Sequence, residues 1–553
     1  MSFQTPSSKA TIHVKGLGQL DGFRYETGVE QFCGIPYADL AKRWTRSTLK
    51  TSWNKNYHDG TQLGNDCAAP LVEGDTSDIL VPVPPNPHFP RQPEIDEKSA
   101  LVMNIVVPEH PTAYGKRFPV FFYIHGGSLL YTGANLGVFD GVNLVSQSVS
   151  MNQPIIVVNF NYRVGLGGFL ASSKIADELR QDGFKGNGNF GFTDQQVAFE
   201  WVQKYIAELG GDPENVTAVG ESAGGISISH QLTARNPPKF HRAICMSGVF
   251  NSLHPAPLAR HEEIFNATCR YFSIDPLSPT VMDQLRGIGE QELANADHII
   301  QGVFSGTGNP CDDGWFYNDR TCLHPETPTW IKSLMIGDVY HEGIIFGLNL
   351  AEDTYNTVKE TLVNHIQDES LVDSILLEYA IEPSLNKEAL IERVSHLGGD
   401  AAFKIPNWQV GLHNKRLQSQ KMLFKYHFDQ RSRLKNELEG TAYHAHELLY
   451  LFGNLKNEMN ETEIAMSRDF ASAWIEFVNG GSPWTSGEGL WKIWGPESVQ
   501  SVKSEEEDEV IRLYSRFKRL QSLGNDDFWR RFLSGIDDLL MKRSKIGQFG
   551  TRK

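Results

Sequence analysis

The sequence predicts an α/β protein built on a large, mostly parallel central sheet with helices on both faces. Short apolar runs, several of them rich in β-branched or aromatic residues, recur at residues 100–108, 119–127 and 154–163. Runs of this length and composition are typical of strands that are buried on both faces. Helical stretches lie between the runs, and strands that are joined through helices can lie parallel in one sheet.

The first long helix is expected over residues 193–209, and further strands are expected over residues 215–222 and 241–248. Thr193 or Asp194 is a candidate N-cap of this helix. Its apolar side chains recur at the spacing of one helix face, at Val197, Trp201, Ile206 and Leu209. The alternation of strand and helix therefore continues to about residue 248.

Helices are also expected in the C-terminal part. Residues 467–484 have an amphipathic pattern, and Gly480 and Gly481 favour a helix that stops there. From about residue 505 the chain is charged and helical in pattern, and the simplest expectation is a solvated terminal helix. We therefore predict a single domain over residues 1–553 with a charged helical extension from about residue 505.

The charge balance argues against several classes of partner. Lys and Arg total 51 against 67 Asp and Glu, which gives a formal net charge of -16. A negative chain repels nucleic acid and anionic membrane surfaces. No apolar run approaches the roughly 18 residues of a membrane helix, and residues 1–16 contain no apolar signal-peptide segment. We expect a cytoplasmic protein without a nucleic-acid partner or a membrane span, and the oligomeric state stays open.

The cysteines and glycines predict neither a metal nor a cofactor. Six cysteines are spread over the chain without metal-ligand spacing. Most are expected to be free, buried thiols, although Cys311 and Cys322 flank a short loop that could close in an oxidising compartment. The nearest glycine cluster, at residues 165–169, lacks the spacing of a dinucleotide-binding loop.

Residues 219–225, VGESAGG, place one serine among small residues directly after an apolar run. A strand that turns sharply into a helix needs glycines on both sides of the apex, and such a nucleophile elbow exposes the hydroxyl of the apical serine. The motif has only three fixed residues of common type, so a chance match is the alternative. Ser222 is therefore a candidate nucleophile whose partners must be found elsewhere.

A second glycine-rich segment follows an earlier predicted strand, as His125, Gly126, Gly127 and Ser128. In hydrolases with a nucleophile elbow, such a loop offers backbone N–H groups to the oxyanion that forms when a carbonyl is attacked. The residue after the nucleophile, Ala223, would supply another N–H group. The alternative is a simple tight turn after a strand.

An acid and a base follow in the order that these hydrolases use, first the carboxylate and then the histidine. Glu342 lies in a polar turn after the apolar run that begins at residue 333. His444 and His446 lie just before LLYLFG, for which a strand-like conformation is expected. The carboxylate would hold the imidazole in one tautomer, and the imidazole would take the serine proton. His444 is preferred, but His446 stays open because both could share one face of a strand.

Together these motifs resemble the type-B carboxylesterases, the family that includes the cholinesterases and some fungal lipases. The resemblance runs from about residue 11 to residue 494. It rests on FCGIPYA, HGG with a following TG, VVNFNYRVGLGGFL, GNFGFTDQQVAFEWV, GGDPENVTAVGESAGG, HEGIIF and HAHELLYLFG. It implies an α/β-hydrolase fold with helical insertions around an active-site gorge, and hydrolysis of carboxylic esters through an acyl-enzyme. A fungal-type intracellular member is expected.

The resemblance also implies roles for single residues. Ser222 would be the nucleophile, Glu342 the acid and His444 the base. His444 stands three residues before Glu447, as in the family pattern, which leaves His446 outside the catalytic position.

Further assignments rest on the resemblance as well. The oxyanion hole is expected from Gly126, Gly127, Ser128 and Ala223, with Ser128 in place of a family glycine. Glu221 and Ser247 match positions that support the histidine; a buried acid bonded to backbone is the simpler alternative. The expected substrate pocket is apolar and contains Leu129, Leu130, Tyr131, Phe250 and Phe346.

One departure from the family bears on the compartment. Ala100 stands where one half of a family disulfide would be, which leaves Cys67 without its expected partner. This agrees with a reducing compartment.

Three functions follow from the sequence. The first is a serine carboxylesterase that acts on small or medium neutral esters. The second is a relative that acts on a lactone, an amide or a secondary-metabolite ester, and the third is a non-catalytic binding module. The presence of Ser222, Glu342 and His444 favours an enzyme over a binding module.

Overall fold

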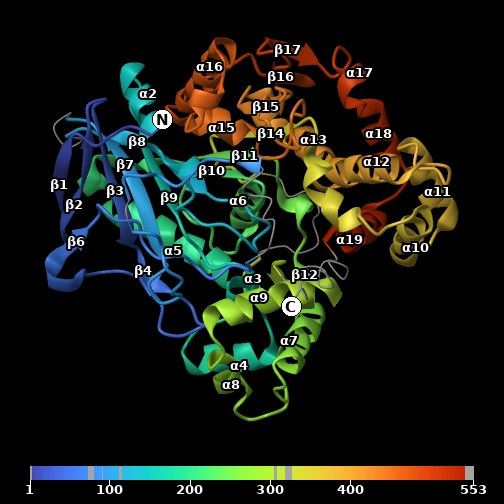
Figure 1. Ribbon diagram of the computed structural model, residues 1–553, viewed down its shortest axis with the longest axis horizontal. Helices are drawn as coiled ribbons and strands as arrows, with labels where there is room; N and C mark the ends of the chain where they lie inside the picture. The colour runs from blue at the N-terminus through green and yellow to red at the C-terminus, as the bar shows by residue number, and fades with distance from the viewer. Residues whose placement is uncertain are drawn as a thin grey trace.

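The computed structural model of the protein describes residues 3–71, 80–89, 91–110, 115–303, 308–317 and 327–541. Thirteen strands in this part of the chain form one sheet (Figure 1). Across the sheet the order is β1 (Ser8–Val14), β2 (Gly18–Tyr25), β3 (Val29–Pro36), β7 (Val102–Pro108), β9 (Ile156–Phe160), β8 (Phe118–Ile124), β10 (Gly211–Glu221), β11 (Arg242–Met246), β14 (Ser333–Val339), β15 (Leu423–Phe428), β16 (Leu490–Trp494) and β17 (Gln500–Ser504). A further strand, β6 (Tyr57–Asp59), pairs with β2.

The central strands from β9 to β16 run parallel, and antiparallel pairs flank them at both edges. The prediction of an α/β protein with a mostly parallel central sheet is therefore confirmed. One of the runs on which this prediction rests, β7, departs from the parallel direction, because it is antiparallel to both β3 and β9. Its side chains are buried throughout, and burial on both faces does not fix the direction of a strand.

The two faces of the sheet carry separate apolar cores. Phe122 of β8 contacts Phe199 on one face, with ring centroids 4.0 Å apart. Its neighbours Phe121 and Tyr123 point to the other face, where both contact Phe452. The first face is covered by α5 (Phe190–Tyr205) and α6 (Ala223–Thr233), and the second by α2 (Val142–Ser150), α15 (Glu447–Phe452) and α16 (Glu461–Val478).

Two helices begin earlier than predicted. α5 starts at Phe190, three residues before the expected cap, because residues 190–192 are buried and extend its packed surface. α16 starts at Glu461, where the side chain of Asn460 accepts a hydrogen bond from the backbone N–H of Glu463 at 2.9 Å. In both helices the type of element was predicted correctly and its first turn was missed.

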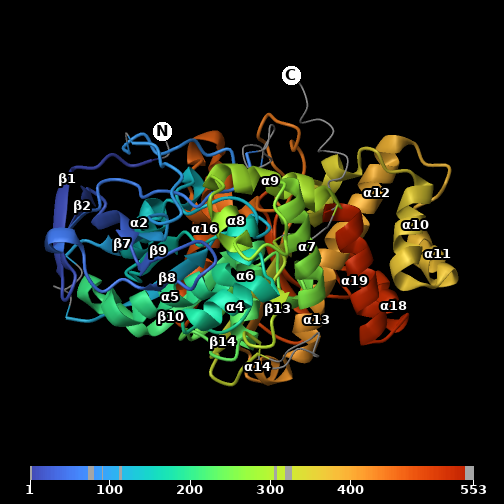
Figure 2. The same cartoon turned by 90° about the horizontal axis from the view of Figure 1, so that it is seen from below.

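A helical layer lies at the end of the molecule opposite β1 in both views (Figures 1 and 2). Its helices share a third apolar cluster. They are α10 (Tyr355–Ile366), α11 (Glu369–Glu378), α12 (Lys387–Gly399), α18 (Tyr514–Ser522) and α19 (Asp526–Met541).

The remaining helices and short strands complete the described part of the chain. The α-helices are α3 (Gly165–Phe169), α4 (Ser173–Gln181), α7 (Leu258–Tyr271), α8 (Val281–Arg286), α9 (Glu290–Val303), α13 (Ile405–His413), α14 (Lys415–Ser419) and α17 (Glu509–Arg512). The strands are β4 (Ala38–Asp39) with β5 (Thr48–Leu49), and β12 (Ala256–Pro257) with β13 (Cys311–Asp312).

The C-terminal extension is helical, but the expectation that it is solvated is wrong. α19 contributes a full face to the third cluster, through Phe528, Trp529, Phe532, Ile536, Leu539 and Leu540. This face packs against α10 and the 3-10 helix η6 (Glu342–Leu350). Apolar residues spaced three and four apart give a helix one apolar face, and burial of that face outweighs the charges on the other.

The described cysteines are free and buried; they are Cys33, Cys67, Cys245, Cys269 and Cys311. Cys322, the other half of the Cys311–Cys322 pair considered above, lies outside the described residues. Among the helices of the described ranges, none combines the length and the apolar character needed to cross a membrane.

Because α19 is packed on the domain, two Leu→Ala variants should differ in their free energy of unfolding. Leu539→Ala removes a side chain that is 5% exposed, so we expect a loss of about 2–5 kcal/mol of unfolding free energy. The matched control is Leu377→Ala in α11, at a side chain that is 72% exposed, where the effect should be close to zero. Thermal unfolding followed by circular dichroism measures both. Equal midpoints for the two variants would mean that α19 is not packed in solution.

Candidate active site

Ser222 lies at a sharp turn between β10 and α6. Its backbone has φ 54° and ψ -124°, a conformation that residues other than glycine rarely adopt. The turn is held from the next strand, because the N–H of Ser222 donates to the carbonyl of Met246 at 2.8 Å. Ala223 follows as the first residue of α6. The predicted nucleophile elbow is therefore present as a strained strand–turn–helix.

Crowding of backbone against backbone explains the small residues around Ser222. A Cβ atom on Gly220 would overlap the backbone of Gly224, and one on Gly224 would overlap the carbonyl of Ile124. A Cβ atom on Gly248 would overlap the carbonyl of Ser222 itself. The glycines thus allow β8, β10 and α6 to approach closely enough to form the turn.

Glu342 and His444 meet although they are 102 residues apart in the chain. Glu342 begins η6, directly after β14, and His444 lies in the turn before α15. His444 Nδ1 lies 2.5 Å from Glu342 Oε2, and the other carboxylate oxygen, Oε1, accepts from the N–H of Val339 at 2.8 Å. The carboxylate is fully buried and is held from both sides, so it fixes the orientation of the imidazole.

The second ring nitrogen of His444 faces the turn that carries Ser222. His444 Nε2 lies 3.2 Å from Oε1 of Glu221, the residue before Ser222. A further buried acid, Glu447, interacts electrostatically with Glu221, and its Oε1 accepts a long hydrogen bond of 3.5 Å from Ser247. The predicted supporting residues Glu221 and Ser247 are thus both brought to the site.

Burial and charge shift the titration of these groups. Burial alone lowers the pKa of His444, but the carboxylates of Glu221 and Glu342 outweigh it and raise that pKa above 6.5. Burial raises the pKa of Glu221 to about 7 and raises the pKa of Glu447 well above its usual range. The nearby carboxylates therefore favour the protonated imidazole of His444. The raised pKa values of Glu221 and Glu447 make it unfavourable for all the carboxylates to be ionised together.

His446 takes a different place. Its ring stacks on Tyr443 with centroids 4.4 Å apart and meets Phe428 edge-on at 5.5 Å. Burial lowers the pKa of His446 to about 3, so its ring is neutral. The strand-like conformation expected for LLYLFG is wrong, because these residues form α15. The segment is buried on every side, and its apolar run has no period that would separate a helix from a strand.

The glycine loop after β8 runs directly against the turn at Ser222. A Cβ atom on Gly126 would lie 2.8 Å from the backbone oxygen of Glu221 and 3.1 Å from Cβ of Ser222. Gly127 and Ser128 have φ angles of 99° and 57°, which turn the chain away after this approach. The main chain thus comes close to Ser222 where no side chain would fit.

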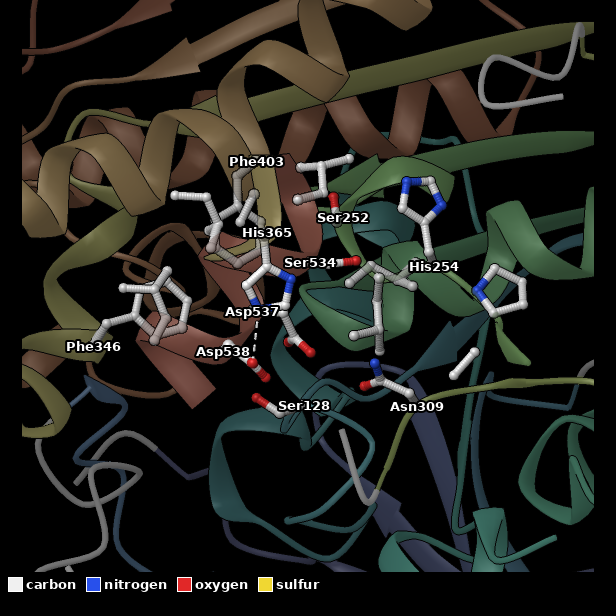
Figure 3. Close-up of a pocket in the computed structure, with 18 of the residues that line it drawn as sticks. Ser128, Ser252, His254, Asn309, Phe346, His365, Phe403, Ser534, Asp537 and Asp538 are labelled. Carbon is white, nitrogen blue, oxygen red and sulfur yellow. Dashed lines mark hydrogen bonds and ion pairs between the residues drawn. The ribbon is translucent and has the colours of Figure 1, made fainter. Parts of the chain in front are cut away.

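A cavity of about 440 Å³ opens beside Ser222. In Figure 3, Phe346 and Phe403 lie on one side of it, and Ser128 lies on its lower edge. A dashed line marks the polar contact between His365 Nε2 and Asp538 Oδ2, at 2.8 Å. Most of the remaining wall is apolar, so the cavity suits a ligand with an apolar body and few polar groups.

Of the five predicted pocket residues, Phe346 lines the cavity, and so does Ser128, which was expected in the oxyanion hole. Four other predicted residues are not among its lining in the described part of the chain: Leu129, Leu130, Tyr131 and Phe250. Positive φ angles at Ser128 and Leu129 turn the Leu129 side chain into the core, and the Phe250 ring packs on His230 at 4.7 Å.

Residues 8–522 match the model of the carboxylesterase family. The match spans both the nucleophile turn and the Glu342–His444 pair. The chain belongs to the carboxylesterase family. It is a carboxylic ester hydrolase with the α/β-hydrolase fold.

Relatives of this carboxylesterase include lipases and esterases. It is 28% identical to Lipase 3 of Yarrowia lipolytica over 469 residues, which cover 82% of this chain and 86% of that lipase. It is 28% identical to para-nitrobenzyl esterase of Bacillus subtilis over 513 residues, which cover 86% and 91%. A solved structure of PNB esterase covers 93% of this chain and 99% of its own, with a TM-score of 0.71 and 25% identity.

The cavity of the carboxylesterase extends beyond the matched residues. α19 begins at Asp526, after the last matched residue at position 522, and still forms one wall. It contributes Leu533, Ser534, Ile536, Asp537, Asp538 and Leu540. This wall was not predicted from the sequence, because no local motif links α19 to Ser222. The apolar spacing within α19 was the one signal that it packs on the domain.

A group of metal-ligand type was not expected from the sequence. His341, Glu392 and His396 lie together in the described structure, outside the cavity lining. The expectation of no metal rested on the spacing of the cysteines, and this group contains no cysteine. Glu392 and His396 are four residues apart, which places them on one face of a helix.

The approach of Gly126 to Ser222 predicts that one methyl group disables the site. Gly126→Ala should lower kcat by about 10²–10³-fold, because the new Cβ displaces the loop that is expected to hold the oxyanion. The matched control is Gly167→Ala, where a Cβ atom meets no other atom within 4 Å. Hydrolysis of a p-nitrophenyl ester measures both. Similar kcat values for the two variants would contradict the assignment of this loop.

Proposed function

We propose that the enzyme hydrolyses esters with Ser222 as the nucleophile, His444 as the base and Glu342 as the acid. The observation that carries this proposal is the Glu342–His444 contact of 2.5 Å, which turns the other ring nitrogen towards the turn at Ser222. The backbone conformation of Ser222 and its position on the cavity wall support the same assignment.

The proposed reaction has two halves. Ser222 Oγ attacks the ester carbonyl carbon while His444 Nε2 takes the hydroxyl proton, and the carbonyl becomes an oxyanion. The oxyanion collapses, the C–O bond to the alcohol breaks, and His444 returns the proton to the leaving alkoxide. Water then attacks the acyl-enzyme with the same base, and the acid product leaves Ser222. Glu342 stabilises the imidazolium in both halves.

We assign the oxyanion hole to backbone N–H groups of Gly126, Gly127, Ser128 and Ala223. The close approach of Gly126 to Ser222 supports this assignment. Glu221 and Ser247 are proposed to support His444 indirectly, since Glu221 faces its ring and Ser247 donates to Glu447.

We propose neutral esters of medium size, with an apolar acyl or alcohol part, as the substrate class. The cavity volume lies within the usual range for small-molecule sites. Ile226, Phe346 and Phe403 supply apolar wall close to Ser222. A lactone, an amide or a secondary-metabolite ester stays the alternative substrate.

A substrate panel separates these classes. p-Nitrophenyl esters of graded acyl length should give the highest kcat/KM at intermediate length, because the longest chains exceed the cavity. Lactones and anilides of matched size serve as comparisons. A higher kcat/KM on lactones or anilides than on every ester would move the proposal to the alternative class.

A labelling experiment tests the nucleophile. An organophosphonate should modify Ser222 at one equivalent per chain, and peptide mass spectrometry identifies the site. Ser222→Ala should lose most turnover, with a residual rate of about 10³–10⁴ over the uncatalysed reaction. Modification of another serine with loss of activity would contradict the assignment.

The pH profile and a pair of histidine variants test the base. The imidazole must be neutral to accept a proton, so activity falls as pH drops through the pKa of His444, which Glu221 and Glu342 raise above 6.5. His444→Gln should abolish turnover, and His446→Gln, as the neighbouring control, should change mainly the KM. Glu342→Gln should lower kcat by about 10⁴-fold and move the acid limb to lower pH. The reverse pattern for the two histidines would assign the base to His446.

We also propose that the enzyme works in the cytoplasm. The free thiol of Cys67, together with Ala100 at the position expected for its partner, supports a reducing compartment. Fractionation of cells that express the full chain should recover the activity with cytoplasmic markers. Recovery with secreted or membrane fractions would contradict this.

A further inference from the structure

Three side chains of metal-ligand type meet where α12 packs on the turn after β14. His341 lies one residue before Glu342, and Glu392 and His396 lie one helical turn apart on α12. His341 Nε2 lies 3.4 Å from Glu392 Oε2, and His396 Nε2 lies 3.1 Å from Glu392 Oε1. The two imidazole rings stack with centroids 4.2 Å apart and planes 11° apart.

The backbone holds this group in place. The N–H of His341 donates to the carbonyl of Ala442 at 2.9 Å, and its side chain is largely buried. α12 packs directly on this turn, because Gly343 sits against the backbone of Ser395 so closely that a Cβ atom would overlap it. The backbones that carry the three residues are therefore held close together.

We propose that His341, Glu392 and His396 form a Zn²⁺ site, with one nitrogen from each imidazole, one carboxylate oxygen and water as the fourth ligand. The ligand atoms all lie within 4.8 Å of one another. Zn²⁺ prefers nitrogen and carboxylate ligands in a tetrahedral arrangement at about 2.0–2.2 Å. To complete the site, the two stacked rings must rotate until a nitrogen of each points at the ion. Zn²⁺ would replace the two imidazole–carboxylate contacts, and each neutral ring would carry its hydrogen on Nδ1 instead of Nε2.

The surroundings suit an ion that is exchangeable rather than deeply buried. Glu392 has a side chain that is 58% exposed, so the ion has a path from solvent. The charge of Lys404 faces His341, but Lys404 is paired with Asp400 at 2.9 Å. The negative net charge of the chain also favours a cation.

The site is proposed to stabilise the fold and to take no part in ester chemistry. Its residues are not among those that line the cavity in the described structure. Bound Zn²⁺ would tie α12 to the turn between β14 and Glu342, so it would stabilise the segment that holds this acid. We therefore expect chelation to lower the thermal midpoint while kcat at 25 °C stays the same.

Zinc binding to the full chain tests the proposal, after treatment with a chelator and dialysis. Isothermal titration should show one saturable Zn²⁺ site per chain, and Zn²⁺ should raise the thermal midpoint. Glu392→Gln and His396→Ala should each weaken this binding by about tenfold or more and remove the thermal shift. Because both side chains lie at or near the surface, folding and kcat should be unchanged.

Two control variants exclude general surface binding. Glu388→Gln changes an exposed carboxylate one turn earlier on α12, and His13→Ala removes an exposed imidazole; both should bind Zn²⁺ like the wild type. Co²⁺ in place of Zn²⁺ should give visible absorption bands that disappear in His396→Ala. Absence of saturable binding, or equal affinity in the wild type, Glu392→Gln and His396→Ala, would overturn the proposal.

Discussion

One buried imidazole lies among three buried carboxylates, and the rest of the active site depends on this arrangement. Glu221, Glu342 and Glu447 are each at most 3% exposed, and three ionised carboxylates in so dry a space would repel one another strongly. Two features reduce this repulsion. The raised pKa of His444 favours a positive charge among the acids, and the raised pKa values of Glu221 and Glu447 favour their neutral forms. The N–H of Val339 stabilises the remaining charge on Glu342. The imidazolium that the proposed reaction forms is therefore favoured before any substrate binds.

The parallel sheet makes this cluster possible, because its central strands end at the same edge. Ser222 follows β10, Ser247 follows β11, Glu342 follows β14 and His444 lies after β15, and these strands are neighbours in that order. Groups far apart in the chain thus meet at the carboxyl ends of adjacent strands, where ligands bind in open α/β sheets. The turn at Ser222 adds a second requirement, since only glycine backbones let β8, β10 and α6 come together there.

Much of the fold could be predicted, and so could the residues proposed for catalysis, because both leave local patterns in the sequence. Small residues around Ser222 and alternating strands and helices follow from backbone sterics and burial. The failures have other causes, namely burial on all sides of a segment and a local backbone conformation. The direction of β7 and the helix at LLYLFG are hidden by burial on all sides. The side chain of Leu129 turns inward because its φ angle is positive, and no sequence motif predicts that angle.

α19 forms part of the cavity wall although it lies beyond the residues that match the family model. Ser222, Glu342, His444 and the strands that precede them lie within residues 8–522, which match the family model. α19 begins after that region, yet it reaches the cavity because its apolar face packs against η6, the element that begins with Glu342. A change in the side chains of α19 would therefore reshape the cavity without moving a strand end. It would also change the packing on η6, the segment that holds Glu342. The same contact of α19 therefore affects both the shape of the cavity and the position of this acid.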